Sequence, residues 1–336
     1  MKLPLEGLKQ EVFSIREEET DIKYGKFPKE RSIEERIDYG FILLDKPAGI
    51  RSKTAAYIAK KLMANLSVKK IGYSGTLEDW RNPNVTGLLP LAINNATKVL
   101  PVLLFGGKEY IALMHLHSEV DEQLLRDTFN KFIGKIMQLP PVRSHVKRQY
   151  RQREIYYSEI LEIDGKDVLF KVGVESVTYI RKLIHDMGEE LKIGAHMVEL
   201  RRTKVSTLSE KDNLVTLQDL EDAVYFYEKE NDERLLNKCL GSIESAIDFL
   251  PKVFISDTAV DPICHGSPLA VPGIVKFTDF NKDEVIGIMT LKGELIALGR
   301  SVLSAEEIKT VKKGVAIKTD SVIMALGTYP QYKRIN

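Results

Sequence analysis

Basic side chains gather at three separate places in this chain of 336 residues, although its formal net charge is only +1. Each group holds several cations within a short stretch: Lys147, Arg148, Arg151 and Arg153; Arg201, Arg202 and Lys204; and Lys309, Lys312, Lys313 and Lys318. Such clusters can neutralise phosphates, and Tyr150 adds an aromatic surface on which a base can stack. A run of charges is usually a solvated face, but three clusters on a nearly neutral chain favour a polyanionic partner.

The cysteines and histidines, in contrast, form no metal-binding pattern. Only Cys239 and Cys264 occur, and their separation fits neither the usual zinc-ligand spacing nor a disulfide framework. His115 and His117 share one face of an expected strand without an evident third ligand, so we interpret them as part of a half-exposed sheet face. The sequence therefore predicts no metal.

The composition also indicates the class of protein and its expected location in the cell. Hydrophobic residues make up 43% and charged residues 29% of the chain, which is typical of a globular protein. No run approaches the roughly 18 apolar residues of a membrane helix, and the N-terminus leads into a charged stretch instead of an apolar signal segment. We expect a cytoplasmic protein with no membrane segment.

The elements that must position these residues follow one another without a regular repeat. The patterns predict strands over residues 40–45, 88–93 and 108–117, helices over 53–66, 122–134 and 179–191, and a hairpin over 156–174. The hairpin turn is expected at Asp164-Gly165-Lys166. This mixture indicates an α+β fold around a mixed or antiparallel sheet.

The composition changes near residue 250. From about residue 208 to residue 249 the pattern is helical and polar, whereas after Pro251 short strands alternate with glycines and prolines. Candidate strands are residues 260–271, 285–291, 295–299 and 314–324. Several short strands within one small region predict a β-barrel and a domain boundary near residue 250.

Several strings of residues, in collinear order, resemble the TruB/dyskerin-type RNA pseudouridine synthases. In the first part of the chain they are residues 40–49, 72–77, 107–110, 138–153, 178–181 and 194–203. Beyond residue 250, the strings 263–266, 269–275 and 290–299 resemble the PUA domain, an RNA-binding module. Residues 31–35, ahead of the first strand, resemble the archaeal dyskerin branch. The resemblance covers roughly residues 20–330.

The resemblance implies three parts and a set of partners. The parts are an N-terminal extension over residues 1–35 that packs on the C-terminal domain, a pseudouridine synthase domain over 36–250, and a PUA domain over 251–336. No cofactor is implied. The implied role is the catalytic subunit of an H/ACA-type ribonucleoprotein acting on rRNA and tRNA, with a guide RNA and a substrate RNA. The implied partner proteins are a small zinc-ribbon-type linker protein, a glycine-arginine-rich-family β-barrel protein and a kink-turn-binding ribosomal-type protein.

Pseudouridine formation breaks the bond between C1′ and N1 of a uridine and joins C1′ to C5. A carboxylate near the ribose must act as nucleophile or base, and an aromatic face must hold the uracil as it rotates. An adjacent arginine keeps the carboxylate ionised. The resemblance assigns the stacking role to Tyr110, the arginine role to Arg181 and a second pocket aromatic to Tyr179. Without the resemblance, Tyr110 would be interpreted as packing and Arg181 as a surface group.

The carboxylate is where this sequence departs from the family. The family has an aspartate directly after Gly-Thr-Leu, but here Leu77 is followed by Glu78 and Asp79, in a loop longer than the family's. Counting forward from Leu77 selects Glu78, whereas counting back from Pro83 selects Asn82, whose amide cannot do the chemistry. A longer loop can compensate for a displaced aspartate, whereas the extra methylene of glutamate moves the carboxylate by about 1 Å, which can cost roughly a hundredfold in rate. We predict Asp79 as the catalytic carboxylate, with Glu78 as the alternative.

Two further departures fall on loops expected to line the pocket. Val177 stands where the family usually has glycine, and because a β-branched residue does not easily take a positive φ, we expect a reshaped turn there. Tyr73 replaces a histidine often found in the family. The lengthened loop over residues 78–86 keeps open a second hypothesis, a catalytically impaired scaffold of an RNA particle that has lost a competent nucleophile. A third hypothesis is a stand-alone tRNA pseudouridine synthase.

The basic clusters supply the candidate RNA-binding residues. We predict that RNA contacts Lys147, Arg148, Arg151, Arg153, Arg201, Arg202, Lys313 and Lys318. The resemblance implies that the lysines of the C-terminal domain hold the 3′ end of a guide RNA. The alternative for these lysines is an ordinary solvated surface.

Overall fold

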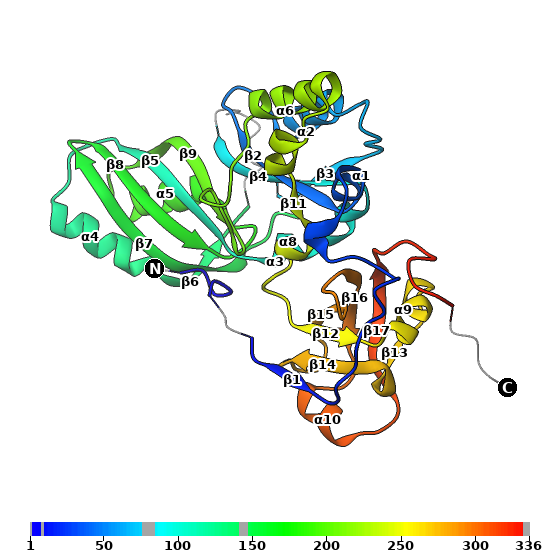
Figure 1. The fold of residues 1–336 in the computed structure, drawn as a ribbon. Coiled ribbons are helices and arrows are strands. Elements are labelled where there is room, and N and C mark those ends of the chain that lie inside the picture. The colour runs from blue at the N-terminus through cyan, green and yellow to red at the C-terminus, as the bar shows by residue number, and fades with distance from the viewer. Residues whose placement is uncertain (1, 8–9, 76–84, 141–146, 332–336) are drawn as a thin grey trace.

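The computed structural model describes residues 2–7, 10–75, 85–140 and 147–331. Two β-sheets organise these residues, one of ten strands and one of seven (Figure 1). The larger sheet is formed by residues between 40 and 242, and all but one strand of the smaller sheet comes from residues after 251. The predicted α+β fold with a small C-terminal β-domain is confirmed.

In the larger sheet the hydrogen-bonded order is β11-β2-β4-β9-β5-β8-β7-β6, with β3 paired to β4 and β10 to β9. The strands are β2 (Gly40–Lys46), β3 (Ile71–Tyr73), β4 (Thr86–Ile93), β5 (Lys108–Leu116), β6 (Gly134–Gln138), β7 (Arg151–Asp164), β8 (Asp167–Val174), β9 (Ala195–Val205), β10 (Leu208–Ser209) and β11 (Gly241–Ser242). The described pairs are antiparallel except for β4 and β9, which run parallel. The predicted hairpin is therefore β7–β8, although β7 begins five residues earlier than expected.

Two groups of helices cover the larger sheet (Figure 1). The first group packs against β2 and β4 and consists of α1 (Ile33–Asp38), α2 (Ser52–Leu62), α6 (Leu217–Glu230) and α7 (Arg234–Cys239). The second packs against β5, β8 and β9 and consists of α4 (Glu122–Lys131) and α5 (Ile180–Glu190). In α5, Leu183, Ile184 and Met187 lie on one face at helical spacing and are fully buried, so this face fixes the helix on the sheet. Shorter connections are η1 (Pro28–Glu30), η2 (Asn94–Val99), α3 (Leu100–Phe105) and α8 (Ile243–Ala246).

The smaller sheet has the strand order β1-β14-β12-β15-β16-β17-β13. Its strands are β1 (Val12–Ser14), β12 (Lys252–Ile255), β13 (Leu269–Ala270), β14 (Ile274–Thr278), β15 (Val285–Thr290), β16 (Leu295–Ser301) and β17 (Val315–Val322). The helices α9 (Asp257–Cys264), η3 (Val271–Gly273) and α10 (Ala305–Thr310) accompany them. Because β1 pairs antiparallel with β14, the N-terminal segment contributes a strand to this sheet although it lies far away in sequence.

The strand predicted over residues 260–271 is wrong. The structure has the helix α9 there, followed by only two strand residues, Leu269 and Ala270. Val260, Ile263 and Cys264 are buried at the spacing of one helical face, and Asp257 stands in the first turn, where an acidic side chain favours a helix. The β-branched residues favour a strand locally and Pro262 disfavours a helix interior, but burial of this face against the smaller sheet outweighs both preferences.

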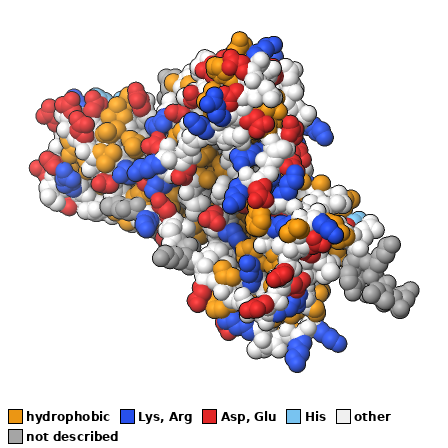
Figure 2. All heavy atoms as spheres, in the orientation of Figure 1, with side chains coloured by type: hydrophobic (Ala, Val, Ile, Leu, Met, Phe, Trp, Pro, Cys, Tyr) orange, Lys and Arg blue, Asp and Glu red, His pale blue; other side chains and the backbone are white. Residues whose placement is uncertain are grey.

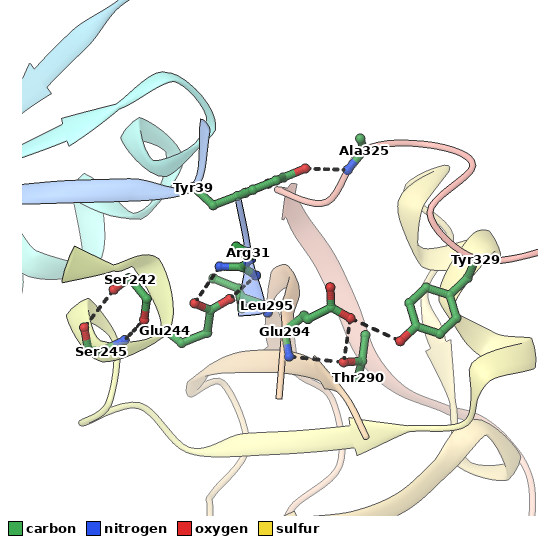
Figure 3. Close-up of polar contacts among 10 residues, drawn as sticks. All are labelled: Arg31, Tyr39, Ser242, Glu244, Ser245, Thr290, Glu294, Leu295, Ala325 and Tyr329. Carbon is green, nitrogen blue, oxygen red and sulfur yellow. Dashed lines mark hydrogen bonds and ion pairs between the residues drawn. The ribbon is translucent and has the colours of Figure 1, made fainter. Parts of the chain in front are cut away.

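Figure 3 shows how the two sheets are joined near residues 31 and 244. Arg31 contacts both carboxylate oxygens of Glu244, at 2.7 and 3.0 Å, and both side chains are nearly buried. The same carboxylate accepts a hydrogen bond from the backbone N–H of Leu295, and the backbone N–H of Ala325 donates to the Tyr39 hydroxyl. The N-terminal segment, the larger sheet and the smaller sheet therefore meet at one polar junction.

Charged side chains are mixed over the face drawn in Figure 2, where Lys and Arg lie among Asp and Glu. Basic and acidic side chains therefore alternate on that face, which agrees with the formal net charge of only +1. Within the described residues, no helix is long and apolar enough to cross a membrane.

Candidate active site

The middle of the larger sheet brings Tyr110, Arg202 and Gly87 into one row. Tyr110 of β5 pairs with Arg202 of β9, and Arg202 pairs on its other side with Gly87 of β4. Neighbouring strands are about 4.8 Å apart, so these residues are direct neighbours across the sheet. Tyr110 is half-buried and Arg202 is fully buried.

The guanidinium of Arg202 contacts backbone carbonyls on both sides of the segment 76–84. Its Nε donates to the carbonyl of Leu88 at 2.9 Å. Its Nη1 and Nη2 donate to the carbonyls of Gly75 and Ser74, each at 3.3 Å. Burial lowers the pKa of Arg202, and its charge interaction and side-chain hydrogen bond with Tyr110 oppose that lowering. One side chain therefore joins the residues after β3, the start of β4 and Tyr110.

Two glycines permit this close approach. Gly87 has a φ of +99°, and a Cβ there would lie 2.3 Å from the carbonyl oxygen of Arg202. Gly75 has a φ of +65°, and a Cβ there would lie 3.2 Å from Nη1 of Arg202. Both positions favour glycine through the backbone conformation and through the lack of space beside Arg202.

A second cation is buried beside Arg202. Lys108, two residues before Tyr110 on β5, donates from Nζ to the carbonyls of Leu104 at 3.2 Å and Gly106 at 3.3 Å. Burial, with a smaller contribution from the charge of Arg202, lowers the pKa of Lys108 to about 7. Among the described residues, no carboxylate forms an ion pair with either cation. The surroundings of Tyr110 therefore hold buried positive charge that the described carboxylates do not neutralise.

Tyr179 and Arg181 lie at the start of α5. Tyr179 directly precedes the helix, and Arg181 is its second residue. The side chain of Gln138, buried at the end of β6, accepts a hydrogen bond from the N–H of Tyr179 at 3.0 Å and donates to its carbonyl at 3.2 Å. The sequence does not identify Gln138 as a site residue, because an amide at the end of a short strand gives no local signal of a contact 41 residues away.

The turn before Tyr179 differs from the expectation for a β-branched residue. Val177 takes a φ of +63°, so the left-handed conformation is kept and the prediction of a reshaped turn is wrong. The carbonyl of Val177 accepts a hydrogen bond from Nε of Arg153, and the Thr178 hydroxyl donates to the carbonyl of Glu175. These contacts hold a conformation that costs on the order of 1–3 kcal/mol for a side chain of this kind.

Both candidate carboxylates, Asp79 and Glu78, lie outside the described residues, as does Asn82. The segment that contains them starts after Gly75 and ends before Val85. Gly75 and Leu88, whose carbonyls Arg202 contacts, therefore flank this segment in the sequence.

The predicted RNA-binding residues have different surroundings. Four of them are exposed: Lys147, Arg148, Lys313 and Lys318. Arg151 and Arg153 are half-buried on β7, with Arg153 next to the turn at Val177. Arg201 contacts the carboxylates of Asp45 and Glu210, each at 3.0 Å, which offset its charge.

The surroundings of Arg202 differ from those expected of a side chain that contacts RNA phosphate, and that contact stays a prediction. Arg202 is fully buried, and the described contacts of its guanidinium are with backbone carbonyls and Tyr110. In this structure the enclosed guanidinium does not reach the protein surface. The sequence pattern identified the residue but not its environment, because Arg is rarely fully buried.

Three histidines lie together at the end of β5 and the start of β9. His117 Nε2 is 3.1 Å from His196 Nδ1, and His115 Nδ1 is 2.7 Å from a carboxylate oxygen of Asp167. His115 is half-buried and the other two are exposed, which matches the predicted half-exposed sheet face. In the described part of the chain, no group of three or more His, Cys, Asp or Glu side chains is arranged to hold a metal ion.

Comparison with known families matches nearly the whole chain. The model of the TruB family pseudouridylate synthase N-terminal domain matches residues 61–180, and that of the tRNA pseudouridylate synthase B C-terminal domain matches residues 181–248. The PUA domain matches residues 251–323, and the DKCLD domain matches residues 2–53.

Individual relatives give the same result. The chain is 46% identical over 327 residues to a probable tRNA pseudouridine synthase B of Pyrococcus horikoshii, with 96% of each chain covered. It is 46% identical over 323 residues to the probable tRNA pseudouridine synthase B of Methanopyrus kandleri, covering 96% of this chain and 93% of the relative.

Among solved structures, the chain resembles one from a Cbf5-Nop10-Gar1 complex, with a TM-score of 0.92, 44% identity and coverage of 98% and 99% of the two chains. It also resembles one from an H/ACA RNP bound to a substrate RNA containing 2′-deoxyuridine, with a TM-score of 0.91, 42% identity and the same coverage. The fold, the site and these matches agree, and the chain belongs to the TruB family of pseudouridine synthases. It is an isomerase that converts uridine to pseudouridine and carries a C-terminal PUA domain.

Proposed function

We propose that this chain is the catalytic subunit of an H/ACA-type particle, in which a guide RNA selects the uridine to be isomerised. The observation that carries the proposal is the match from end to end with a chain of a Cbf5-Nop10-Gar1 complex. The match covers 98% of this chain and therefore includes the N-terminal segment that pairs with the smaller sheet. A stand-alone tRNA pseudouridine synthase is the second candidate, favoured by the names of the curated relatives.

The partners follow from the same similarity. The structural relatives are complexes with Nop10 and Gar1, or with a substrate RNA. For this chain we propose a substrate RNA, a guide RNA, a small zinc-ribbon-type linker protein and a glycine-arginine-rich-family β-barrel protein. The kink-turn-binding ribosomal-type protein stays a prediction from the sequence resemblance.

The proposed catalytic roles combine a carboxylate of residues 78–79 with Tyr110, Tyr179 and Arg181. Asp79, or alternatively Glu78, attacks or deprotonates at the ribose while the bond between C1′ and N1 breaks. Tyr110 stacks on the freed uracil, and Tyr179 adds a second aromatic surface. Arg181 keeps the carboxylate ionised. C1′ then bonds to C5, C5 loses its proton, and N1 gains one, so no oxidant or cofactor is needed.

The proposed RNA surface uses the accessible basic residues. Lys147 and Arg148 precede β7, which begins at Arg151, and Arg153 near its start donates to the carbonyl of Val177. Lys313 and Lys318 lie next to or on β17 of the smaller sheet. Cations on both sheets suit an RNA that crosses from one to the other, with phosphate neutralisation supplying most of the affinity.

We also propose that residues 36–250 and 251–336 are separate domains, with residues 1–35 packing on the second. The separate strand sets of the two sheets and the pairing of β1 with β14 support this division. A protease site inserted near residue 250 tests it. The cut chain should keep its two parts associated through the junction and through β1, and immediate loss of all structure after the cut would contradict the division.

Guide dependence tests the main proposal. The chain is mixed with its proposed partner proteins and a substrate RNA labelled with tritium at C5, whose release measures isomerisation. We expect release only with a guide RNA that pairs around the target uridine, and none with a mismatched guide. Modification of tRNA by the chain alone, at an undiminished rate, would favour the stand-alone enzyme. Absence of release in every mixture would favour the catalytically impaired scaffold.

The carboxylate assignment is tested by paired substitutions in the same assay. Asp79→Asn should abolish tritium release and leave RNA binding nearly unchanged, because the amide keeps the shape but cannot act as nucleophile or base. Glu78→Gln is the matched control and should reduce the rate less. Full activity in the Asp79→Asn protein would move the assignment to Glu78.

The RNA surface is tested by salt dependence. Replacement of Lys147, Arg148, Arg151 and Arg153 by alanine should weaken RNA binding and flatten its dependence on salt, by about 0.7–0.9 in logarithmic slope for each lost phosphate contact. Lys131 and Lys192, which are exposed elsewhere, provide the control and should leave the slope unchanged when replaced by alanine. An identical slope in both variants would remove this surface from the proposal.

A further inference from the structure

We propose that His117 and His196 bind a divalent transition-metal ion, Cu²⁺, Ni²⁺ or Zn²⁺, at the outer end of the larger sheet. His117 directly follows β5, and His196 is the second residue of β9. A strand rises about 3.4 Å per residue, so His117 lies more than about 20 Å along the strand direction from Tyr110. The site is separate from the candidate active site, and the proposal does not depend on the proposed function.

The two ring nitrogens that face each other have the separation of neighbouring metal ligands. Nε2 of His117 is 3.1 Å from Nδ1 of His196. Two nitrogens that each lie about 2.0–2.1 Å from one ion, at a right or tetrahedral angle, are about 2.8–3.4 Å apart. Without an ion, one of the two nitrogens must carry a proton that it donates to the other. A metal ion replaces that proton and uses the lone pairs of both rings.

Strand pairing brings a third imidazole and a carboxylate to the same face of the sheet. His115 pairs with His196 of β9 on one side and with Asp167 of β8 on the other. Residues paired across strands point to one face, and His117 lies two positions after His115, so the four side chains share that face. The rings of His115 and His196 are 5.4 Å apart, and Nδ1 of His115 is 2.7 Å from a carboxylate oxygen of Asp167. This carboxylate adds negative charge beside the proposed cation.

The backbone fixes the ring of His117 in the orientation that the site needs. Gly194 has a φ of +73°, and a Cβ there would lie 2.6 Å from Nδ1 of His117. The ring therefore lies against the glycine, with Nε2 turned toward His196. The sequence predicted no metal because His115 and His117 alone share a strand face, whereas His196 comes 79 positions after His117 and joins them only through the pairing of β5 with β9.

The number of ligands and their chemistry define the class of ion. Over the described ranges of the chain, no set of three or more His, Cys, Asp or Glu side chains is arranged to hold a metal, so the protein supplies two nitrogens and water supplies the other ligands. Both imidazoles are exposed, which leaves space for these waters. Imidazole nitrogen suits Cu²⁺, Ni²⁺ and Zn²⁺, whereas Mg²⁺ and Ca²⁺ prefer oxygen. We expect Cu²⁺ to bind more tightly than Ni²⁺ or Zn²⁺.

Metal titration of the full chain, without an affinity tag, tests the proposal. Zn²⁺ is added in the presence of excess Mg²⁺, and its binding is measured by equilibrium dialysis. Loss of an outer-shell partner already weakens metal binding about 10–100-fold, so His117→Gln and His196→Gln should each weaken the tightest Zn²⁺ equivalent at least about tenfold. The control is His185→Gln, because His185 is also exposed and its Nδ1 lies 3.7 Å from a carboxylate oxygen of Asp186 on α5. The control should keep its affinity, and absence of binding in the unmodified chain, or equal affinity in all variants, would overturn the proposal.

Electron paramagnetic resonance with one equivalent of Cu²⁺ identifies the ligands directly. The unmodified chain and His185→Gln should show splitting from two imidazole nitrogens, and His117→Gln should show one nitrogen fewer. Urea unfolding without metal checks that each variant is folded, and a saturating ion should then stabilise only the chains that keep both histidines. A copper spectrum without nitrogen splitting, or the same spectrum in His117→Gln and in the unmodified chain, would overturn the assignment. Each of these measurements gives its result whether or not the protein isomerises uridine.

Discussion

Charge is buried in two regions of this molecule, and its surroundings differ between them. At the junction of the two sheets, Arg31 and Glu244 form a two-point ion pair with 7% and 12% of their side chains exposed (Figure 3). In the candidate active site, Arg202 and Lys108 are buried against carbonyl groups, and no described carboxylate pairs with them. The Arg31–Glu244 pair is neutral, whereas the buried cations beside Tyr110 have no described carboxylate partner.

This difference distinguishes the junction between the sheets from the proposed reaction site. A joint only has to hold its parts together, and a charge that is paired and hydrogen-bonded there leaves no unbalanced field. A site that keeps a carboxylate ionised while it binds a polyanion benefits from cations that its neighbours do not cancel. We therefore predict that substitution at the junction lowers the free energy of unfolding strongly. Substitution of a buried cation beside Tyr110 should change how that free energy depends on pH.

The largest expected effect follows from breaking the neutral pair. Arg31→Met leaves Glu244 buried without its partner and removes the contact of Arg31 with the ring of Tyr39. Loss of one partner of a buried pair typically costs about 3–5 kcal/mol, measured here as the change in the free energy of unfolding by urea. The control is Arg234→Met, whose guanidinium is exposed on Asp232 and whose loss should leave the unfolding curve nearly unchanged. Equal effects of the two variants would show that the junction is not a special site.

The pocket cations give the second prediction. The pKa of Lys108 is lowered to about 7 by burial first and by Arg202 second, so the folded protein releases a proton more readily than the unfolded chain does. The charge of Lys108 destabilises the fold fully below about pH 7, and this cost disappears as the pH rises toward 10.5, the value for an ordinary lysine. Stability should therefore rise over this range, with each pKa unit of difference contributing roughly 1.4 kcal/mol.

Lys108→Met tests this prediction, because methionine has a similar length and no charge. Its free energy of unfolding should exceed that of the unmodified protein by a few kcal/mol at most near pH 7, since about 1.4 kcal/mol corresponds to one pKa unit. The two curves should converge toward pH 10. Parallel curves over the whole range would mean that Lys108 is not the titrating group.

Some elements of the fold could be predicted from the sequence, and others could not. The β7–β8 hairpin was predictable because alternating residues flank a turn with Gly165 at a positive φ, all within one short stretch. The pairing of β1 with β14 joins residues more than 260 positions apart, and three strand residues carry no signal of it. The helix α9 was missed because burial, which depends on the partner sheet, decided against the local strand preference.

Some residues of the candidate active site could likewise be predicted from the sequence, and others could not. The resemblance located Tyr110, Tyr179 and Arg181 on particular strands and helix ends, and the structure gives each a defined place on β5 or at the start of α5. The charged neighbours of Arg202 in the sequence favour a surface position, and only the pairing of β4, β9 and β5 places it in the middle of the sheet. The roles of Gln138 and Lys108 likewise depend on contacts that no local pattern encodes.

A smaller effect is expected at the edge of the junction, where Glu294 is a lone buried acid beside the neutral pair (Figure 3). Burial is the largest cause that raises the pKa of Glu294, so its ionised form costs stability. That cost is absent below the ordinary value of 4.5, grows as the pH rises through the raised pKa, and persists above it.

Glu294→Gln should remove this pH dependence. The hydrogen bonds from Thr290 and Tyr329 both end on the same carboxylate oxygen, so a glutamine oxygen at that position can accept both. We expect the difference in free energy of unfolding between the two proteins to shift in favour of the glutamine variant as the pH rises from 4 to 7, by about 1 kcal/mol for each unit or so of raised pKa. A difference that does not change with pH would show that the carboxyl titrates as in the unfolded chain.

The smallest predicted effect concerns backbone strain at Val177. We compare this residue with Asn231 at the C-cap of α6, which has a similar φ. Val177, next to Tyr179, has a φ of +63°, and Asn231, which ends α6, has a φ of +55°. Asparagine tolerates this conformation, whereas a β-branched valine in it is strained by on the order of 1–3 kcal/mol. Val177→Gly should therefore stabilise the protein by about 1 kcal/mol, because relief of strain exceeds the roughly 0.5–1 kcal/mol of entropy that glycine loses on folding. Asn231→Gly should change the free energy of unfolding by only a few tenths. If Val177→Gly destabilises the protein instead, then the half-exposed valine side chain makes contacts worth more than its strain, and the turn before Tyr179 is held by that side chain and not only by the hydrogen bond from Arg153.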